Sequence, residues 1–356
     1  MRLMQDFCKG VLISCALVVA LPAKAQPTQV FPAQGKQPYV VRPQGSTVQL
    51  YRRSAALVVS ASRYPAGATG WPALPSTTME MDTVRDLLVQ HGFEVTRVYN
   101  PTAQELHQEM QNFLGRYGNH ADARLLFFYS GHGYTNSGNQ MAYVVPVDAG
   151  NPRTDYSNFI SRSITLESFH TWVRQFQARH FMAIFDSCFS GAIFTTKSSS
   201  DLPDYRPLGL DDRWRYLTNV TNKPVRQFIS AGGPDEELPA QSSFVPVFIE
   251  GLRGGASSIK DGYVTGKELG VFLERVVSTK RAGKQNPVSG VSRDTGYIFG
   301  DMVFQYEPGK AAVINAETTD SGGARRGQAS HQTQQQTVRP PDPLSEECKL
   351  FDCKKP

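Results

Sequence analysis

Short apolar runs alternate with polar, helix-like segments along the middle of the chain. Five of these runs are rich in β-branched or aromatic residues and end in turn residues, which is typical of buried strands. They are AALVVSA (55–61), FEVTRVY (93–99), RLLFFYS (124–130), FMAIFDS (181–187) and RQFISAG (226–232). A further run, IFGDMVF (298–304), predicts another strand at an edge of the sheet.

Helix-start signals lie between the runs. Thr77, Thr102 and Thr265 are each followed three residues later by a glutamate, the spacing of a capping box in which each end satisfies the other's free amide. Strands that alternate with helices predict right-handed crossovers, a mostly parallel sheet and helices on both of its faces. The predicted fold class is therefore α/β.

Composition divides the chain into ordered and low-complexity parts. Residues 26–54 are rich in Gln and Pro, lack helical or strand periodicity, and are interpreted as a linker. Residues 55–306 are predicted to form the ordered domain. Residues 307–356 are read as a disordered tail, because a polar, low-complexity segment cannot bury enough apolar surface to fold alone.

The first 25 residues have the pattern of a secretory signal peptide. A basic start, an apolar run too short to span a bilayer and an A-x-A site ending at Ala25 favour a cleaved leader over a membrane anchor or a lipoprotein at Cys15. We therefore expect an exported protein, periplasmic or secreted, with no membrane anchor after cleavage. The formal charge then falls from +5 to 34 − 31 = +3 without a basic block, so nothing indicates nucleic acid or an anionic membrane as the partner.

One of the three cysteines beyond the leader stands apart from the others. Cys348 and Cys353 are close enough in the sequence to form a disulfide bond in an oxidising compartment. That bond would leave Cys188 unpaired, and an odd thiol in an exported protein is a candidate reactive residue.

His132 and Cys188 each follow a predicted strand. Residues 124–130 run into GHG, and residues 181–187 run into Cys188. Ligands bind open α/β sheets outside the carboxyl ends of the strands, so neighbouring strands would bring the two side chains together. A thiol attacks as its thiolate, and an imidazole can take its proton. The amides of Gly133 and Cys188 could hold the oxyanion of a tetrahedral intermediate.

Each of these two residues has a more ordinary interpretation when taken alone. A lone cysteine in an apolar strand is usually a small core residue, and a lone histidine in a glycine-rich turn is usually structural. The pair is more informative, because both residues follow strands and have glycine nearby. The histidine also precedes the cysteine by 188 − 132 = 56 residues, near the roughly 50-residue offset of caspases.

RLLFFYSGHG and FMAIFDSCFSG resemble the caspase-like cysteine peptidases of clan CD, and their metacaspase and bacterial branch more than animal caspases. ALVVSASRY, LLVQHGFEVTRVYN and MAYVVPVDA are similar to the early part of that family's domain, and ISAGGPDE, FIEGLRGG, DGYVTGKEL and GDMVF to its later, smaller part. The resemblance implies a three-layer α/β/α sandwich with a mostly parallel sheet of roughly six strands. It also implies a large-subunit-like part (55–194), a linker (195–225) and a small-subunit-like part (226–306).

The resemblance assigns the catalytic roles. It makes Cys188 the nucleophile, His132 the general base, and the amides of Gly133 and Cys188 the oxyanion hole. Metacaspases carry an aspartate two residues before the nucleophile, as Asp186 stands here, where animal caspases carry the glutamine of Q-A-C-[RQG]-G. A carboxylate in that pocket would pair with Arg or Lys and repel Asp. The alternative for Asp186 is a strand-end carboxylate that caps a neighbouring loop.

Metacaspase pockets use a second acid from the segment after the first strand. Glu80 is nearest to that position, and Asp82 lies two residues further on. The capping box with Thr77 is an alternative role for Glu80.

The sequence supports no metal or cofactor site. SSIKDGYVTGKEL places Asp261, Gly262 and Glu268 at positions five, six and twelve of a calcium loop, but Ile259 stands at position three and cannot be a ligand. A turn followed by a capped helix fits this stretch better. TNSGNQM after the histidine carries no carboxylate, so we expect calcium independence or weak dependence. No CxxC or HxxxH spacing supports zinc.

The polar stretch at 195–226 has two interpretations. An enzyme that cuts after basic residues could process itself there, or the stretch could be an uncut surface loop. Its candidate cleavage residues are Lys197, Arg206, Arg213, Arg215 and Lys223.

These observations predict an exported cysteine endopeptidase that acts on polypeptides after Arg or Lys through a thioester acyl-enzyme. The main alternative is a caspase-like domain that has lost turnover and serves as a binding module. Activity on another substrate class, such as amide transfer, is a further alternative. The sequence leaves the oligomeric state open.

Overall fold

A computed structural model describes residues 28–65, 70–136, 138–139, 141–188, 196–198, 210–232, 241–292 and 294–308. Residues 188, 196–198, 210–211 and 295 are described by their backbone alone. The predicted signal peptide and the Cys348–Cys353 pair lie outside the described residues. No helix in the described ranges is long and apolar enough to cross a membrane.

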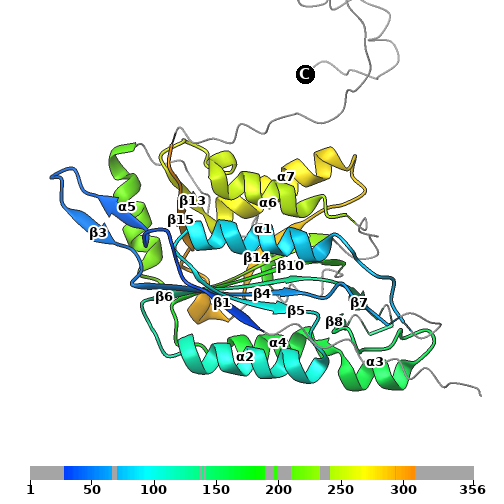
Figure 1. The fold of residues 1–356 in the computed structure, drawn as a ribbon. Helices are drawn as coiled ribbons and strands as arrows, with labels where there is room; N and C mark the ends of the chain where they lie inside the picture. Colours follow the sequence, from blue (N-terminus) through cyan, green and yellow to red (C-terminus); the bar gives the residue numbers. More distant parts are fainter. Residues whose placement is uncertain are drawn as a thin grey trace, which may run out of the picture. The chain divides into compact units, whose positions relative to one another are not determined.

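An eight-stranded sheet forms the centre of the described residues, in the order β1-β5-β4-β6-β10-β12-β14-β11 (Figure 1). Its five central strands are mutually parallel and confirm the five strands predicted from apolar runs, with small differences at their ends. They are β5 (Glu94–Tyr99), β4 (Arg53–Ser60), β6 (Ala123–Ser130), β10 (His180–Cys188) and β12 (Val225–Gly232).

Antiparallel strands enlarge the sheet beyond the roughly six strands that we expected. They are β1 (Gln29–Phe31) beside β5, β14 (Val288–Ser292) beside β12, and β11 (Thr196–Ser198) beside β14. The predicted edge strand at 298–304 is wrong. Only its end forms a strand, β15 (Val303–Gln305), which pairs with β13 (Tyr263–Thr265) in a separate two-stranded sheet.

Helices cover both faces of the sheet, which confirms the predicted three-layer sandwich (Figure 1). One face carries α1 (Thr77–Gln90), α6 (Phe244–Glu250) and α7 (Gly266–Lys280). The other carries α2 (Ala103–Tyr117), α3 (Tyr156–Arg162) and α4 (Leu166–Val173). Side chains alternate between the faces along each strand, so Phe127 packs towards α2 and α4, whereas Phe128 packs towards α1 and α6.

Smaller elements complete the described part of the chain. Three strands form a second sheet near the end of β6, and a hairpin precedes β4. The remaining elements are β2 (Tyr39–Val41), β3 (Thr47–Gln49), β7 (Gly133–Thr135), β8 (Ala142–Val144), β9 (Ile164–Thr165), α5 (Leu210–Thr221), a π-helical turn (Gly251–Gly255) and a 3-10 turn (Thr295–Tyr297).

Two segments read as linker or loop contain regular structure. The stretch 28–54 holds β1, β2 and β3, and α5 lies within 195–225. The segments pack together, because Leu50 and Tyr51 share a buried cluster with Leu217 and Val220 of α5. Three-residue strands show no periodicity, so this order depends on tertiary packing that the local sequence does not reveal.

Two of the three predicted capping boxes are confirmed. Thr102 with Glu105 begins α2, and Thr265 with Glu268 begins α7, each with both reciprocal hydrogen bonds. The third, Thr77 with Glu80, is wrong, because α1 starts one residue earlier than a Thr77 cap requires and its N-cap is Ser76.

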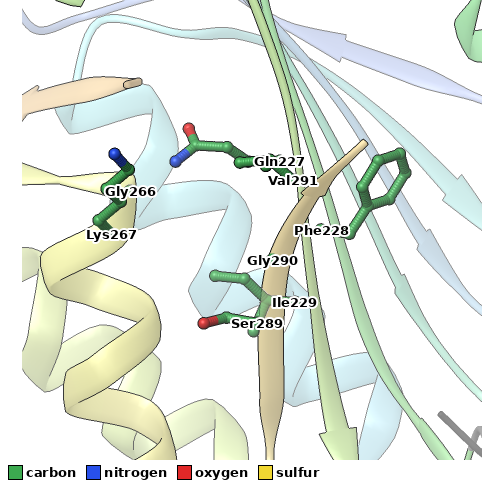
Figure 2. Close-up of a pocket in the computed structure, with 8 residues that line it drawn as sticks. All are labelled: Gln227, Phe228, Ile229, Gly266, Lys267, Ser289, Gly290 and Val291. Carbon is green, nitrogen blue, oxygen red and sulfur yellow. The ribbon is translucent and has the colours of Figure 1, made fainter. Parts of the chain in front are cut away.

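Helix α7 begins close against β12, beside a small hollow (Figure 2). A Cβ atom on Gly266 would lie 2.5 Å from the side-chain amide of Gln227, so glycine permits this approach. The hollow is lined by Gln227, Phe228, Ile229, Gly266, Lys267, Ser289, Gly290 and Val291, none of which is a predicted site residue. His132, Asp186 and Cys188 lie elsewhere, at the carboxyl edge of the parallel strands.

Candidate active site

The strand register places His132 and Cys188 at the same edge of the sheet. Ser130 of β6 pairs with Asp186 of β10, and the two candidates each follow two residues after that pair. The strand ends stay connected, because the Gly131 amide donates to the Asp186 carbonyl (3.4 Å) and the Ser187 hydroxyl donates to the Gly131 carbonyl (2.8 Å). Adjacent strands lie about 4.8 Å apart, so the backbone brings the two positions close.

Strand β10 is irregular where Cys188 lies. Phe185 pairs with Ser230 and Cys188 with Gly232, so three steps along β10 match two along β12. An extra residue of this kind is a β-bulge, which redirects side chains and is common beside active sites. Gly133, the other predicted oxyanion-hole residue, begins β7 directly after His132 and pairs with Val144.

The backbone of His132 is fixed on both sides by buried groups. Its amide donates to the hydroxyl of Tyr64 (2.9 Å). Its carbonyl accepts from the hydroxyl of Tyr129 (3.1 Å) and from the amide of Val145 (3.2 Å). Burial raises the pKa of both tyrosines, so their hydroxyls stay neutral.

The imidazole of His132 is held in one tautomer. Its Nε2 lies 2.7 Å from the carbonyl oxygen of Pro72, and since a carbonyl can only accept, Nε2 carries the proton. Nδ1 is then the basic nitrogen. Burial lowers the pKa of His132, with the Pro72 hydrogen bond opposing this effect, so the ring is neutral and able to accept a proton at neutral pH.

Two aromatic rings pack against the same imidazole. The indole of Trp71 stacks on it, with centroids 5.0 Å apart and an interplanar angle of 28°. The ring of Tyr64 lies on it at 4.7 Å with a tilt of 59°.

Asp186 lies within the bulge, and two serines hold its carboxylate. It is 8% exposed, and its Oδ2 accepts from Ser130 (2.9 Å) while its Oδ1 accepts from Ser242 (3.0 Å). Burial raises the pKa of Asp186 to about 6, an effect that the two hydroxyls oppose and the charge of Glu80 reinforces.

Glu80 reaches the same place from helix α1. Its Oε1 accepts from the amide of Ser242 (3.1 Å), the residue whose hydroxyl binds Asp186. Burial also raises the pKa of Glu80, against the hydrogen bonds from Ser242 and Ser76. The structure thus brings Asp186 and Glu80 together on Ser242, beside the end of β10.

Asp82 makes different contacts. Its Oδ1 lies 2.9 Å from Nε of the buried Arg97 and 3.4 Å from Arg85, and it accepts from the Tyr99 hydroxyl (3.1 Å). Asp82 thus neutralises the buried guanidinium of Arg97. It lies on a different side of α1 from Glu80.

Sequence reasoning missed the residues that hold this site: Trp71, Pro72, Ser130 and Ser242. The first two lie in a loop without periodicity, and Ser242 follows residues 233–240, which lie outside the described part. Ser130 carried a signal, because it ends the strand before GHG. Parallel pairing of the two strands could have predicted that the hydroxyl of Ser130 lies beside Asp186.

The acidic side chains in the stretch that resembles a calcium loop bind a cation of the protein itself, the guanidinium of Arg213. Arg213 of α5 binds Asp261 (2.7 Å) and Glu268 (3.1 Å), and all three side chains are buried. Gly262 turns the chain into β13 and the capped α7, so the predicted turn and capped helix are confirmed. Among the described residues, no group of three or more His, Cys, Asp or Glu side chains could hold a metal ion.

The family of the chain follows from its similarity to known proteins. Residues 53–295 match the family described as "Caspase domain". A solved structure, the crystal structure of caspase-1 from Spodoptera frugiperda, is similar with a TM-score of 0.40 and 14% identity over 70% of this chain and 90% of that chain. No curated protein matches the chain. Since the family match covers more than half of its length, the chain belongs to the caspase-domain family of cysteine peptidases.

Proposed function

We propose that this protein is an endopeptidase that hydrolyses peptide bonds after Arg or Lys, with Cys188 as nucleophile and His132 as general base. Membership of a peptidase family implies a polypeptide substrate. The observation that carries the proposed specificity is the convergence of Asp186 and Glu80 on Ser242, next to the strand end that carries Cys188.

The buried carboxylate of Asp186 and the half-buried carboxylate of Glu80 are suited to bind a cation. Burial raises the pKa of both, and no Lys or Arg of the described part lowers either value. A guanidinium or ammonium from the substrate would supply the missing positive charge and would be held by charge-assisted hydrogen bonds. An aspartate side chain at that position would be repelled.

The proposed reaction has two stages. Nδ1 of His132 takes the proton of the Cys188 thiol as sulfur attacks the peptide carbonyl carbon, and the amides of Gly133 and Cys188 hold the resulting oxyanion. The C–N bond then breaks, and the imidazolium donates its proton to the leaving amine. Water, deprotonated by the same imidazole, hydrolyses the thioester and frees the thiol.

Export and self-processing belong to the proposal as well. A leader at 1–25 would place the enzyme in the periplasm or outside the cell. Within 195–226, Arg213 is a poor cleavage site because it is buried in ion pairs within a helix. We propose self-cleavage at another basic residue of that stretch, without calcium. Incubation of purified wild type and Cys188→Ala should give fragments from the wild type only, at equal rates with calcium or with EDTA.

Hydrolysis of three fluorogenic peptides that differ only in Arg, Lys or Asp before the reporter tests the proposed activity. We expect the Arg and Lys peptides to be cleaved by wild type and not by Cys188→Ala. Cleavage of the Asp peptide alone would contradict the pocket assignment. Cleavage of none would favour the binding module.

A further inference from the structure

The loop that precedes α1 carries an aromatic residue that nothing in the sequence pattern singled out. Trp71 is half-buried, and its indole lies nearly parallel to the imidazole of His132 with centroids 5.0 Å apart. The next residue, Pro72, supplies the carbonyl that accepts from Nε2 of the same imidazole. One dipeptide therefore contacts both the face and one edge of the ring.

Trp71 is anchored independently of the histidine. Its indole N–H donates to the carbonyl of Gly150 (3.1 Å), and the Gly150 amide in turn donates to Asn158 of α3 (2.7 Å). The indole also contacts Tyr134 and Phe159 edge-on or tilted, with centroids 6.4 and 6.5 Å away. The loop is thus tied to α3, on the face of the sheet that carries α2 and α4.

We propose that Trp71 is a positioning residue for His132. Its anchored indole holds the imidazole plane and keeps the Pro72 carbonyl against Nε2, so that Nδ1 is the nitrogen presented to Cys188. This inference rests on the proposed roles of His132 and Cys188.

The chemistry explains why such a support matters. The imidazole must carry a proton between sulfur and the leaving amine, and a rotated ring or the other tautomer would place a hydrogen where a lone pair is needed. An aromatic face also stabilises the imidazolium formed during the reaction. Tyr64, the titratable side chain packed on the ring, stays neutral because burial raises its pKa, so it adds no charge.

The experiment compares Trp71→Leu and Trp71→Phe with wild type, using an Arg peptide amide and the matching Arg p-nitrophenyl ester. An amide also needs a proton delivered to its leaving nitrogen, whereas p-nitrophenolate leaves without one, but both substrates need the imidazole to deprotonate the thiol and the hydrolytic water. We expect Trp71→Leu to lower kcat about 10- to 100-fold on both substrates, at least as much for the amide as for the ester, and to leave KM within about twofold. Trp71→Phe keeps a stacking ring and should recover most of the amide activity.

Trp172→Phe is the matched control. That indole also donates to a carbonyl, that of Met110 (3.0 Å), but it belongs to α4 and packs in the core against Phe127, Phe169, Phe176 and Phe181. We expect Trp172→Phe to keep kcat on both substrates within about threefold of wild type. A wild-type kcat in Trp71→Leu, a loss in Trp71→Leu confined to KM, or the same fall of kcat in Trp172→Phe would overturn the proposal.

A second readout does not depend on peptide hydrolysis. In 15N-labelled full-length protein, the ring nitrogens of His132 should show the Nε2–H tautomer in wild type and in Trp71→Phe, and a mixture of tautomers in Trp71→Leu. A single unchanged tautomer in Trp71→Leu would refute the positioning role. Absence of any hydrolysis by wild type would instead refute the proposed function, and the two failures are therefore distinguishable.

Discussion

The hydroxyl of Ser242 donates to the carboxylate of Asp186 at 3.0 Å, and this contact joins the loop before α6 to the end of β10. The same serine, which precedes the N-cap residue Ser243, also binds the start of α6, because its Oγ accepts from the amides of Phe244 (3.1 Å) and Val245 (3.0 Å). Its own amide binds Glu80. The proposed specificity pocket is thus tied to a helix N-terminus, whose partial positive charge favours nearby carboxylates.

The pH dependence of activity on basic peptides should report Asp186. Its pKa of about 6 means that the carboxyl is charged above pH 6 and neutral below it, and a neutral carboxyl binds a cation weakly. We expect kcat/KM for an Arg peptide to fall as the pH drops through about 6, mainly because KM rises. Asp186→Asn should be poorly active at every pH, and its pH profile should lack the fall in kcat/KM near pH 6. A wild-type profile that is flat between pH 5 and 7 would contradict the assignment.

The same carboxylate should destabilise the fold at neutral pH. Its folded pKa of about 6 lies above the ordinary value of 3.8, so its contribution to stability is present below pH 3.8 and is lost as the pH rises through 6. We expect Asp186→Asn to raise the free energy of unfolding by about 1–3 kcal/mol at pH 7.5 and by much less at pH 4. Urea unfolding at the two pH values measures this difference. A variant less stable than wild type at pH 7.5 would argue that Asp186 is structural.

His180 should make the protein sensitive to acid. The Tyr51 hydroxyl donates to its Nδ1 (2.8 Å) and its Nε2 donates to the Lys223 carbonyl (2.9 Å), so the buried ring has no place for a second proton. Burial lowers its pKa from 6.5 to about 3, so its stability contribution is present above pH 6.5 and is lost as the pH falls towards 3. His180→Asn should therefore remove about 1.4 kcal/mol per pH unit from the slope of unfolding free energy between pH 4 and 6. An unchanged slope would show that His180 is not the titrating group.

The buried ion pairs of Arg213 should be essential for α5. Replacing Arg213 by Met leaves Asp261 and Glu268 buried without their cation, which costs about 3–5 kcal/mol. Arg215 is exposed on the same helix, where it forms a surface pair with Asp212 and lies over the Trp214 ring, so Arg215→Met is the control and should change stability by less than about 0.5 kcal/mol. Similar unfolding midpoints for the two variants would contradict the structural role of Arg213.

The central sheet could be predicted because its strands are apolar on both faces. Leu125 to Phe128 pack alternately against helices on the two sides, and such a run is recognisable in isolation. Strand β14 was missed, because VSGVS contains serine and glycine and depends on its neighbours β12 and β11. The N-terminal strands were missed for the same reason.

The candidate site was predictable only where chemistry coincides with a strand end. His132 and Asp186 lie at such ends, so parallel pairing brings their strands together. Ser242 and Trp71 reach the site from loops, and their contacts join residues far apart in the sequence. No local pattern marks a residue whose role is set by a partner in another loop.

The rate of alkylation of Cys188 against pH, in wild type and His132→Ala, tests the central claim most directly. Mass spectrometry of the peptide that contains Cys188 distinguishes it from the other cysteines. If His132 takes the proton of the thiol, wild-type alkylation by iodoacetamide should rise well below the free-thiol pKa of about 8.5, and in His132→Ala it should follow that value. Identical profiles in the two proteins would contradict the pairing of Cys188 with His132.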